Sequence, residues 1–265
     1  LSGTRVGNQI AIEFFTPPPL DFLRRVGEVL PNYNVEISPE SHDLRVRETF
    51  GKRYGNAELE GMLAALLDNG CRRVDLFFMI GLPRQDYDSV QATVRYCGEL
   101  LQRFGRGGRL LPMIAPLAPF VDPGSAIFEA PERFGYRLFH RTLAEHRQAM
   151  LSPCWKHALN YETEWMSRDD IVRATYDAGE ALVTLKERHG LLEAAQAQRI
   201  RGAIGQARAL ATWIGNPGPV DEALRREIRA LNRLTTLCDK RELEWPIGGW
   251  KFHPVKIARF LLTGR

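Results

Sequence analysis

Cysteine is scarce in this 265-residue sequence, and the four cysteines are far apart. Their separations are 26, 57 and 84 residues, so the sequence contains no CxxC or CxxxCxxC cluster. Disulfide-rich secreted scaffolds have a higher cysteine density, and cysteine-bound metal clusters need closely spaced thiolates. We therefore expect no metal site, and mostly buried free thiols in a reducing, cytoplasmic environment. The four residues are Cys71, Cys97, Cys154 and Cys238.

Long apolar runs and a strong charge imbalance are also missing. No stretch of 18 consecutive apolar residues occurs, so we expect no membrane span. The net charge is only +4, and no basic stripe is interleaved with aromatic residues, so nucleic acid is not an expected partner. With 44% hydrophobic and 26% charged residues, the composition is that of an ordinary globular protein.

The first part of the chain alternates short apolar runs with amphipathic stretches. The apolar runs predict four strands, at residues 10–15, 34–37, 74–80 and 110–114. Helical spacing predicts helices over 20–30, over 57–67 and from Asp86 or Asp88 to about 104, with Gly70 ending the second. This alternation favours βαβ units. The predicted fold class is α/β. About four strands are too few to close an eight-stranded barrel, so they could form an open sheet or a partial parallel (β/α) barrel.

The second part of the chain has a different composition. Residues 115–133 contain four prolines and predict a long irregular segment. The remainder predicts helices at 136–150, 168–189, 191–214 and 219–240. We therefore expect two domains: the α/β units at residues 1–134, and an all-α C-terminal region at residues 135–265.

Two motifs follow predicted strands, where α/β folds bind their ligands. In EISPESHD (36–43), a Glu–Ser pair could accept hydrogen bonds from ribose hydroxyls or an ammonium group. Alternatively, Ser41 or Asp43 caps the following turn and Glu40 is solvated. In VDLFFMIGLPRQD (74–86), the glycine permits close approach of a cofactor's flat ring, although a purely structural turn would also need it.

Taken together, these segments resemble a known family. The order EISPESHD, FGKRYGNAELE and DLFFMIGLPRQDYDSV is similar to the later strands of radical S-adenosylmethionine (SAM) barrels. It most resembles the subgroup that carries a cobalamin-binding domain before the barrel. Segments within 121–132 and 155–163 are similar to the same subgroup, so the resemblance covers residues 10–180 approximately.

The resemblance implies a SAM site at the ends of the strands. Glu40 and Ser41 stand where the family's fourth strand meets the ribose or amino-acid part of SAM. Lys52, with Arg53 beside it, stands near the position of the arginine that reaches the SAM carboxylate in many relatives. Lysine lacks the bidentate fork of arginine.

The resemblance also assigns the adenine contacts. Met79 and Gly81 lie on the strand against which the family packs adenine. Ile114 and Ala115 match backbone that also borders adenine.

The family's CxxxCxxC loop, which binds a [4Fe–4S] cluster, is missing here. The first strand resembles the family's third, so the resemblance implies that residues 1–134 form a partial parallel (β/α) barrel, the C-terminal half of the family's barrel. We therefore expect the cluster loop and any cobalamin domain to precede Leu1. The resemblance implies a parent enzyme that cleaves SAM reductively to a 5′-deoxyadenosyl radical, or transfers a methyl group with cobalamin. It also implies a small-molecule substrate and an electron donor such as flavodoxin or ferredoxin. We expect this C-terminal fragment to be inactive alone.

Other interpretations remain open. The chain could be a non-catalytic half-barrel that binds a ligand or a partner. A tRNA-modifying enzyme would need an RNA-binding domain, and the helical region shows no β-rich pattern for one. His140 and His146 are expected on nearly opposite faces of one helix, away from any metal. The aromatic group Trp155, Tyr161 and Trp165 could line a substrate pocket or serve packing. The basic, apolar tail 251–265 could touch a membrane, although docking on the body is the favoured interpretation.

Overall fold

The computed structural model describes residues 9–116, 121–152, 154–214, 222–233 and 262. The chain divides into two units, Leu1–Thr235 and Thr236–Arg265. The second unit contains a single described residue, Leu262.

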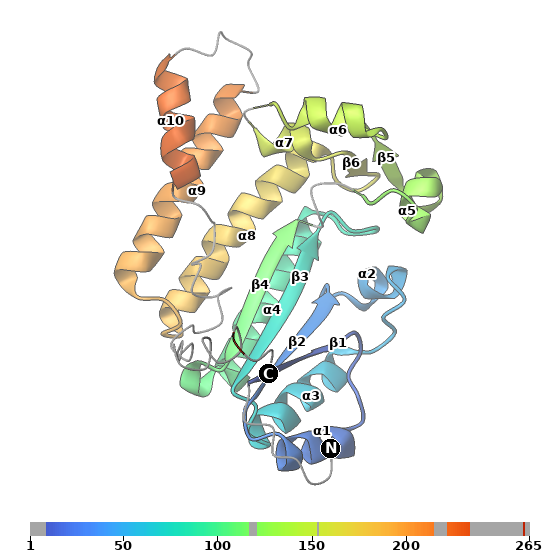
Figure 1. Ribbon diagram of the computed structural model, residues 1–265, viewed down its shortest axis with the longest axis vertical. Coiled ribbons are helices and arrows are strands. Elements are labelled where there is room, and N and C mark those ends of the chain that lie inside the picture. The colour runs from blue at the N-terminus through green and yellow to red at the C-terminus, as the bar shows by residue number, and fades with distance from the viewer. Residues whose placement is uncertain (1–8, 117–120, 153, 215–221, 234–261, 263–265) are drawn as a thin grey trace. The chain divides into compact units, whose positions relative to one another are not determined.

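The first unit is built on a four-stranded parallel sheet. Its order is β1-β2-β3-β4, the same as the order in the chain, as in successive units of a (β/α) barrel (Figure 1). The predicted fold class is confirmed by this sheet and the helices that follow it. The strands are β1 (Ile10–Phe14), β2 (Tyr33–Glu40), β3 (Arg73–Ile80) and β4 (Leu110–Pro116).

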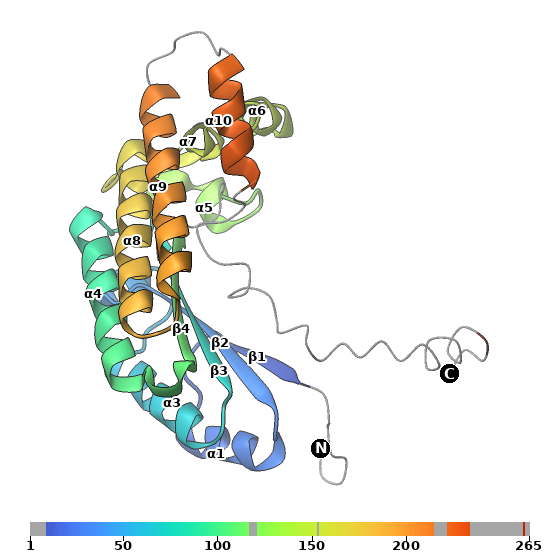
Figure 2. The same ribbon diagram turned by 90° about the vertical axis from the view of Figure 1, so that its left-hand side faces the viewer.

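Three helices cover one face of the sheet (Figure 2). They are α1 (Leu20–Val29), α3 (Asn56–Asp68) and α4 (Tyr87–Phe104). Asp86 caps α4, as predicted, because its side chain accepts a hydrogen bond from the Ser89 amide at 2.8 Å. Gly70 follows α3, as predicted, and its φ is +81°. Glycine is favoured there because it adopts a positive φ without steric cost.

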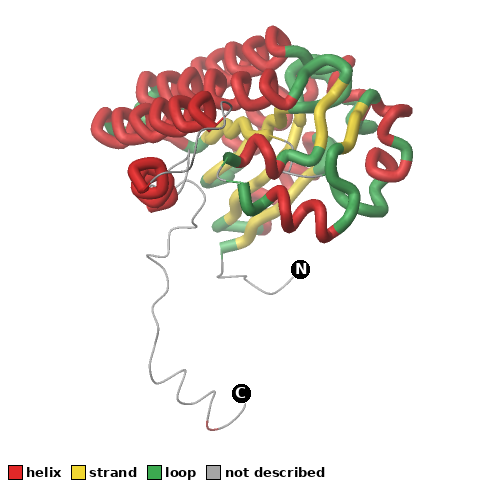
Figure 3. The backbone as a smooth tube through the Cα atoms, turned by 90° about the horizontal axis from the view of Figure 1, so that it is seen from above, coloured by secondary structure: helices red, strands yellow, loops and turns green. Residues whose placement is uncertain are grey.

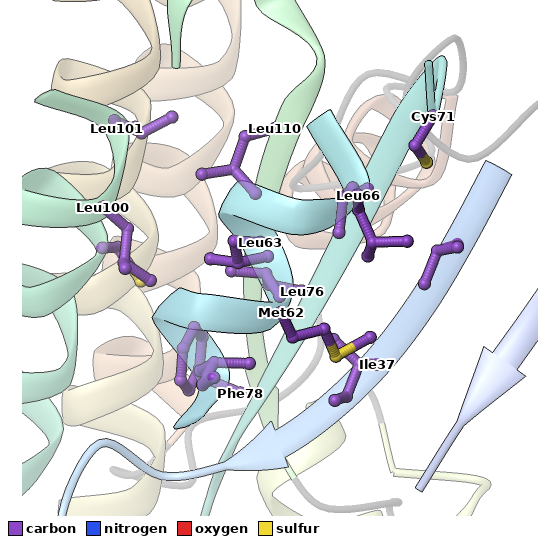
Figure 4. Close-up of a cluster of buried hydrophobic side chains, with 14 of the residues drawn as sticks. Ile37, Met62, Leu63, Leu66, Cys71, Leu76, Phe78, Leu100, Leu101 and Leu110 are labelled. Atoms are coloured by element: carbon purple, nitrogen blue, oxygen red, sulfur yellow. The ribbon is translucent and has the colours of Figure 1, made fainter. Parts of the chain in front are cut away.

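The main core lies between this face and the helices (Figure 4). Val35, Val74 and Leu110 share one row of the sheet and are fully buried there. Leu63 and Leu66 of α3 close the layer from the helix side, and each fully buried leucine contributes about 1.5–3 kcal/mol. Because side chains alternate along a strand, the next row faces the other side of the sheet.

The region after β4 differs from the prediction. It contains α5 (Ala126–Glu129), the 3-10 helix η2 (Pro131–Phe134), β5 (Tyr136–Leu138), α6 (Leu143–Ala149), α7 (Trp155–Ala158) and β6 (Tyr161–Thr163). The predicted helix 136–150 and the all-α character are therefore wrong here. Strands β5 and β6 pair antiparallel, which places Tyr136 and Tyr161 in the core. Helix α6 begins only after its N-cap residue Thr142, which forms a capping box with Glu145.

Long helices complete the unit: α8 (Arg168–Arg188), α9 (Ala194–Ile214) and α10 (Glu222–Arg233). They confirm the helices predicted at 168–189 and 191–214, and α10 confirms the described part of 219–240. Helix α8 packs against α4, β4 and α9, and Figure 3 shows the long helices beside the strands. The domain boundary after residue 134 stays a prediction.

Two short elements remain, α2 (Leu44–Thr49) after β2 and the 3-10 helix η1 (Arg106–Gly108) before β4. No helix in the part of the chain that the structure describes is long and apolar enough to cross a membrane. The tail 251–265 lies outside the described residues except for Leu262.

Candidate functional site

The carboxyl end of β2 forms an unusual turn at Glu40. Ile37 pairs with Leu76 and Glu40 with Phe78, so β2 contains one extra residue, a β-bulge. The Ser41 amide donates a hydrogen bond to the Pro39 carbonyl at 2.8 Å, which makes Glu40 the centre of a three-residue turn. The φ of Glu40 is +68°, which is rare and strained for a residue other than glycine. Strain of this kind clusters at functional sites.

The carboxylate of Glu40 is buried, with a relative exposure of 5%. Its Oε1 accepts a hydrogen bond from Lys52 Nζ at 2.5 Å, whereas its Oε2 is buried without a hydrogen-bond partner. Burial raises the pKa of Glu40, and the neighbouring Lys52 offsets only part of this increase. Because a buried unpaired oxygen is costly, Oε2 is the natural acceptor for a donor on a ligand.

Lys52 lies beside the same turn. Its Nζ also donates a hydrogen bond to the Ser38 carbonyl at 2.5 Å, and it lies 5.8 Å from the ring centroid of Phe15. An ammonium has three donors, so one N–H remains for an anionic group after these two hydrogen bonds. The neighbouring Arg53 is exposed.

Ser41 serves the local structure of the turn. The residue is fully buried, and its Oγ accepts a hydrogen bond from the Asp43 amide at 3.1 Å. Asp43 in turn caps α2 by accepting from the Arg45 amide at 2.9 Å. The capping alternative is therefore confirmed for Ser41 and Asp43, but its second part is wrong, because Glu40 is not solvated.

The Gly-Leu-Pro turn after β3 is held from inside the protein. Gln85 is fully buried, and its Oε1 accepts hydrogen bonds from the amides of Gly81 (2.8 Å) and Leu82 (3.3 Å). Its Nε2 donates to the Met79 carbonyl at 2.9 Å. The Gly81 carbonyl accepts from the Tyr136 hydroxyl at 3.0 Å. The amides of Gly81 and Leu82 and the carbonyls of Met79 and Gly81 therefore all have hydrogen-bond partners within the protein.

A side chain explains why position 81 is glycine. The φ of Gly81 is +89°, and a Cβ atom there would lie 2.8 Å from the Tyr161 hydroxyl. The sequence suggested that a cofactor ring could lie close to Gly81. On the side where a Cβ atom would project, Tyr161 of β6 is the group that lies close to Gly81. Tyr161 is fully buried, and burial raises its pKa.

The remaining predicted residues lie on β3 and β4. Met79 pairs with Ala115, and the two lie on the sheet face opposite the main core. Met79 is half-buried and Ala115 is exposed. Ile114 packs against the main core and against a second core cluster, which contains Tyr136 and Tyr161. Its side chain therefore points away from the sheet face that carries Met79 and Ala115.

The two predicted strand ends come together at one edge of the sheet. Glu40 pairs with Phe78, which directly precedes Met79, and Met79 pairs with Ala115. Neighbouring strands lie about 4.8 Å apart, so these positions lie on adjacent strands at the same end of the sheet.

Sequence reasoning missed three residues of this region: Arg47, Gln85 and Tyr161 in its contact with Gly81. Arg47 is fully buried behind the Glu40–Ser41 turn. Gln85 contacts residues three to six positions earlier in the chain, whereas Arg47 and Tyr161 contact residues outside their own elements. These contacts depend on how the turns fold, which no residue pattern in the sequence indicates.

The described cysteines do not form a metal site. Cys71, Cys97 and Cys154 are buried free thiols, as predicted, and Cys238 lies outside the described residues. Burial raises the pKa of Cys71 to about 11 and that of Cys97 to about 12. Among the described residues, no group of three or more His, Cys, Asp or Glu side chains could hold a metal ion.

The other candidates are used in packing. His140 precedes α6, and its ring centroid lies 5.9 Å from that of His146, so their predicted placement on opposite faces of one helix is wrong. The aromatic group is divided between separate contacts. Trp155 donates a hydrogen bond to the Tyr176 hydroxyl at 2.9 Å, and Trp165 packs against Gly135.

Comparisons with known proteins give few matches. No family model matches the sequence, and no curated protein matches it. Among solved structures, the chain is similar to coproporphyrinogen III oxidase (HemN) from Escherichia coli, which is described as a radical SAM enzyme. The identity is 13% and the TM-score is 0.35, and the alignment covers 85% of this chain and 68% of the other.

Proposed function

We propose that this chain forms the nucleoside-binding wall of a radical SAM enzyme. The observation that carries the proposal is the buried, unpaired Oε2 of Glu40, at the sheet edge where parallel α/β folds bind their ligands. The order of the EISPESHD, KRY and IGLP segments supports SAM as that ligand.

The residues present fit SAM. Glu40 Oε2 would accept a hydrogen bond from a ribose hydroxyl or the ammonium group. The remaining N–H of Lys52 would donate to the carboxylate. Met79 would offer a soft apolar surface to adenine, next to the exposed Ala115.

The residues present do not fit the iron–sulfur cluster. Cluster binding needs thiolates at set spacing, and the described cysteines are buried in separate places. We therefore propose that the cluster ligands lie in a preceding part of the enzyme, together with any cobalamin domain. This chain, as its C-terminal portion, would bind SAM without cleaving it. The proposed enzyme is cytoplasmic, takes a small-molecule substrate and receives electrons from flavodoxin or ferredoxin.

Binding of S-adenosylhomocysteine, measured by isothermal titration calorimetry, tests the site. A hydrogen bond to a charged group contributes about 1.5–3 kcal/mol, so Glu40→Gln should weaken binding by roughly tenfold or more. Glu36→Gln is the matched control, since Glu36 lies on the same strand away from the edge. Equal losses in both variants, or no binding by the wild type, would rule out the proposed site. The second result would favour a partner-binding module.

Anaerobic treatment with iron and sulfide tests the predicted inactivity. We expect neither the absorption of a [4Fe–4S] cluster nor cleavage of SAM. The appearance of both would show that the chain is a complete catalyst.

A further inference from the structure

We infer that Arg47 is a positioning residue of the Glu40 site, an inference that rests on the proposed function. Arg47 belongs to α2 and is fully buried. The ion pairs of the described residues include none with Arg47, so no carboxylate explains its burial. Burial lowers its pKa, as expected for a charge removed from water.

Backbone and amide oxygens take the place of a carboxylate. Arg47 donates to the Ser41 carbonyl from Nε at 3.0 Å and from Nη2 at 2.7 Å. Nη1 donates to the Tyr54 carbonyl at 2.8 Å, and Nη2 also donates to Asn56 Oδ1 at 2.7 Å. The guanidinium lies 4.8 Å from the centroid of the Tyr54 ring. The planar guanidinium group thus links the Glu40–Ser41 turn to the start of α3 through hydrogen bonds.

Two cations close together in the chain hold the two sides of the turn. Lys52 holds the Ser38 carbonyl and one oxygen of Glu40, while Arg47 holds the Ser41 carbonyl. The strained φ of Glu40 persists because its neighbours on both sides are fixed. Because Lys52 donates its hydrogen bond to Oε1, Oε2 of Glu40 has no partner within the protein and could accept a hydrogen bond from a ligand.

The test compares Arg47→Lys with Arg109→Lys. Lysine keeps the charge but cannot reach these separate acceptors at once. Arg109 is a matched control, because it also donates to two backbone carbonyls, those of Leu67 and Cys71, far from the site. We expect Arg47→Lys to weaken S-adenosylhomocysteine binding by roughly tenfold, while Arg109→Lys leaves it unchanged even where it lowers Tm. In Arg47→Ala, millimolar guanidinium should restore part of the affinity.

A second measurement needs no ligand. The Ser41 amide, bonded to the Pro39 carbonyl, should exchange its hydrogen faster in Arg47→Lys than in the wild type or in Arg109→Lys. Unchanged affinity in Arg47→Lys, or equal losses in both variants that follow Tm, would overturn the inference. If the wild type binds no S-adenosylhomocysteine, the proposed function fails, and Ser41 exchange alone then decides whether Arg47 holds the turn.

Discussion

Replacing Gly81 with alanine should destabilise the protein through two separate effects. The first is backbone strain, because φ is +89° at this position and a Cβ atom costs about 1–2 kcal/mol in the left-handed region. The second is overpacking, because the new Cβ would lie 2.8 Å from the Tyr161 hydroxyl and 3.1 Å from its Cε2. Overpacking of a buried site costs about 1–3 kcal/mol. Together they predict a loss of about 2–5 kcal/mol in the free energy of unfolding.

Gly70 offers a control that isolates the first effect. Its φ is +81°, but a Cβ atom there would meet no atom within 4 Å. Gly70→Ala should therefore cost only the strain, about 1–2 kcal/mol. Urea unfolding followed by circular dichroism gives both values.

The double variant Gly81→Ala/Tyr161→Phe separates the effects further. Removal of the hydroxyl should recover part of the overpacking cost but none of the strain. Equal costs for Gly81→Ala and Gly70→Ala, with no recovery in the double variant, would refute the packing of Tyr161 on Gly81.

Three further predictions follow from buried polar groups. Gln85→Ala should lower the free energy of unfolding by about 3 kcal/mol, because two amides and a carbonyl lose their partner; urea unfolding measures this. Cys71 and Cys97, with pKa values raised to about 11 and about 12, should not react with a thiol reagent at pH 8 until the protein unfolds. Because burial raises the pKa of Glu40, the native state retains a proton that the unfolded chain has lost, so stability should fall as pH rises through that raised pKa. Glu40→Gln should flatten this part of the curve of Tm against pH, and an unchanged curve would contradict the assignment.

The sheet could be predicted because its signal is local. The run VDLFFMI is apolar apart from Asp75, and Asp86 stands directly before the helix that it caps. Pairing between β5 and β6 joins residues far apart in the chain, so its three-residue strands left no pattern that could compete with a helical interpretation.

The location of the candidate site stays a prediction, and its detailed structure could not be predicted from the sequence. A Glu–Ser pair after a strand indicated where a ligand could bind. The burial of Glu40 depends on Lys52 and on the bulge in β2, which are tertiary features. Gly81 shows the same limit, because the glycine was recognisable as a close contact while its partner, Tyr161, lies on a distant strand.

We propose that the ends of β2 and β3 together bind one nucleoside. Methyl-labelled methionine gives a direct test by NMR, since the sequence contains only five methionines. On titration with S-adenosylhomocysteine, the Met79 methyl signal should shift, and Glu40→Gln should weaken the response. Met62, a fully buried residue of α3, should not respond. A titration that leaves Met79 unchanged, or shifts only the exposed Met150, would show that the two strand ends do not form a nucleoside site.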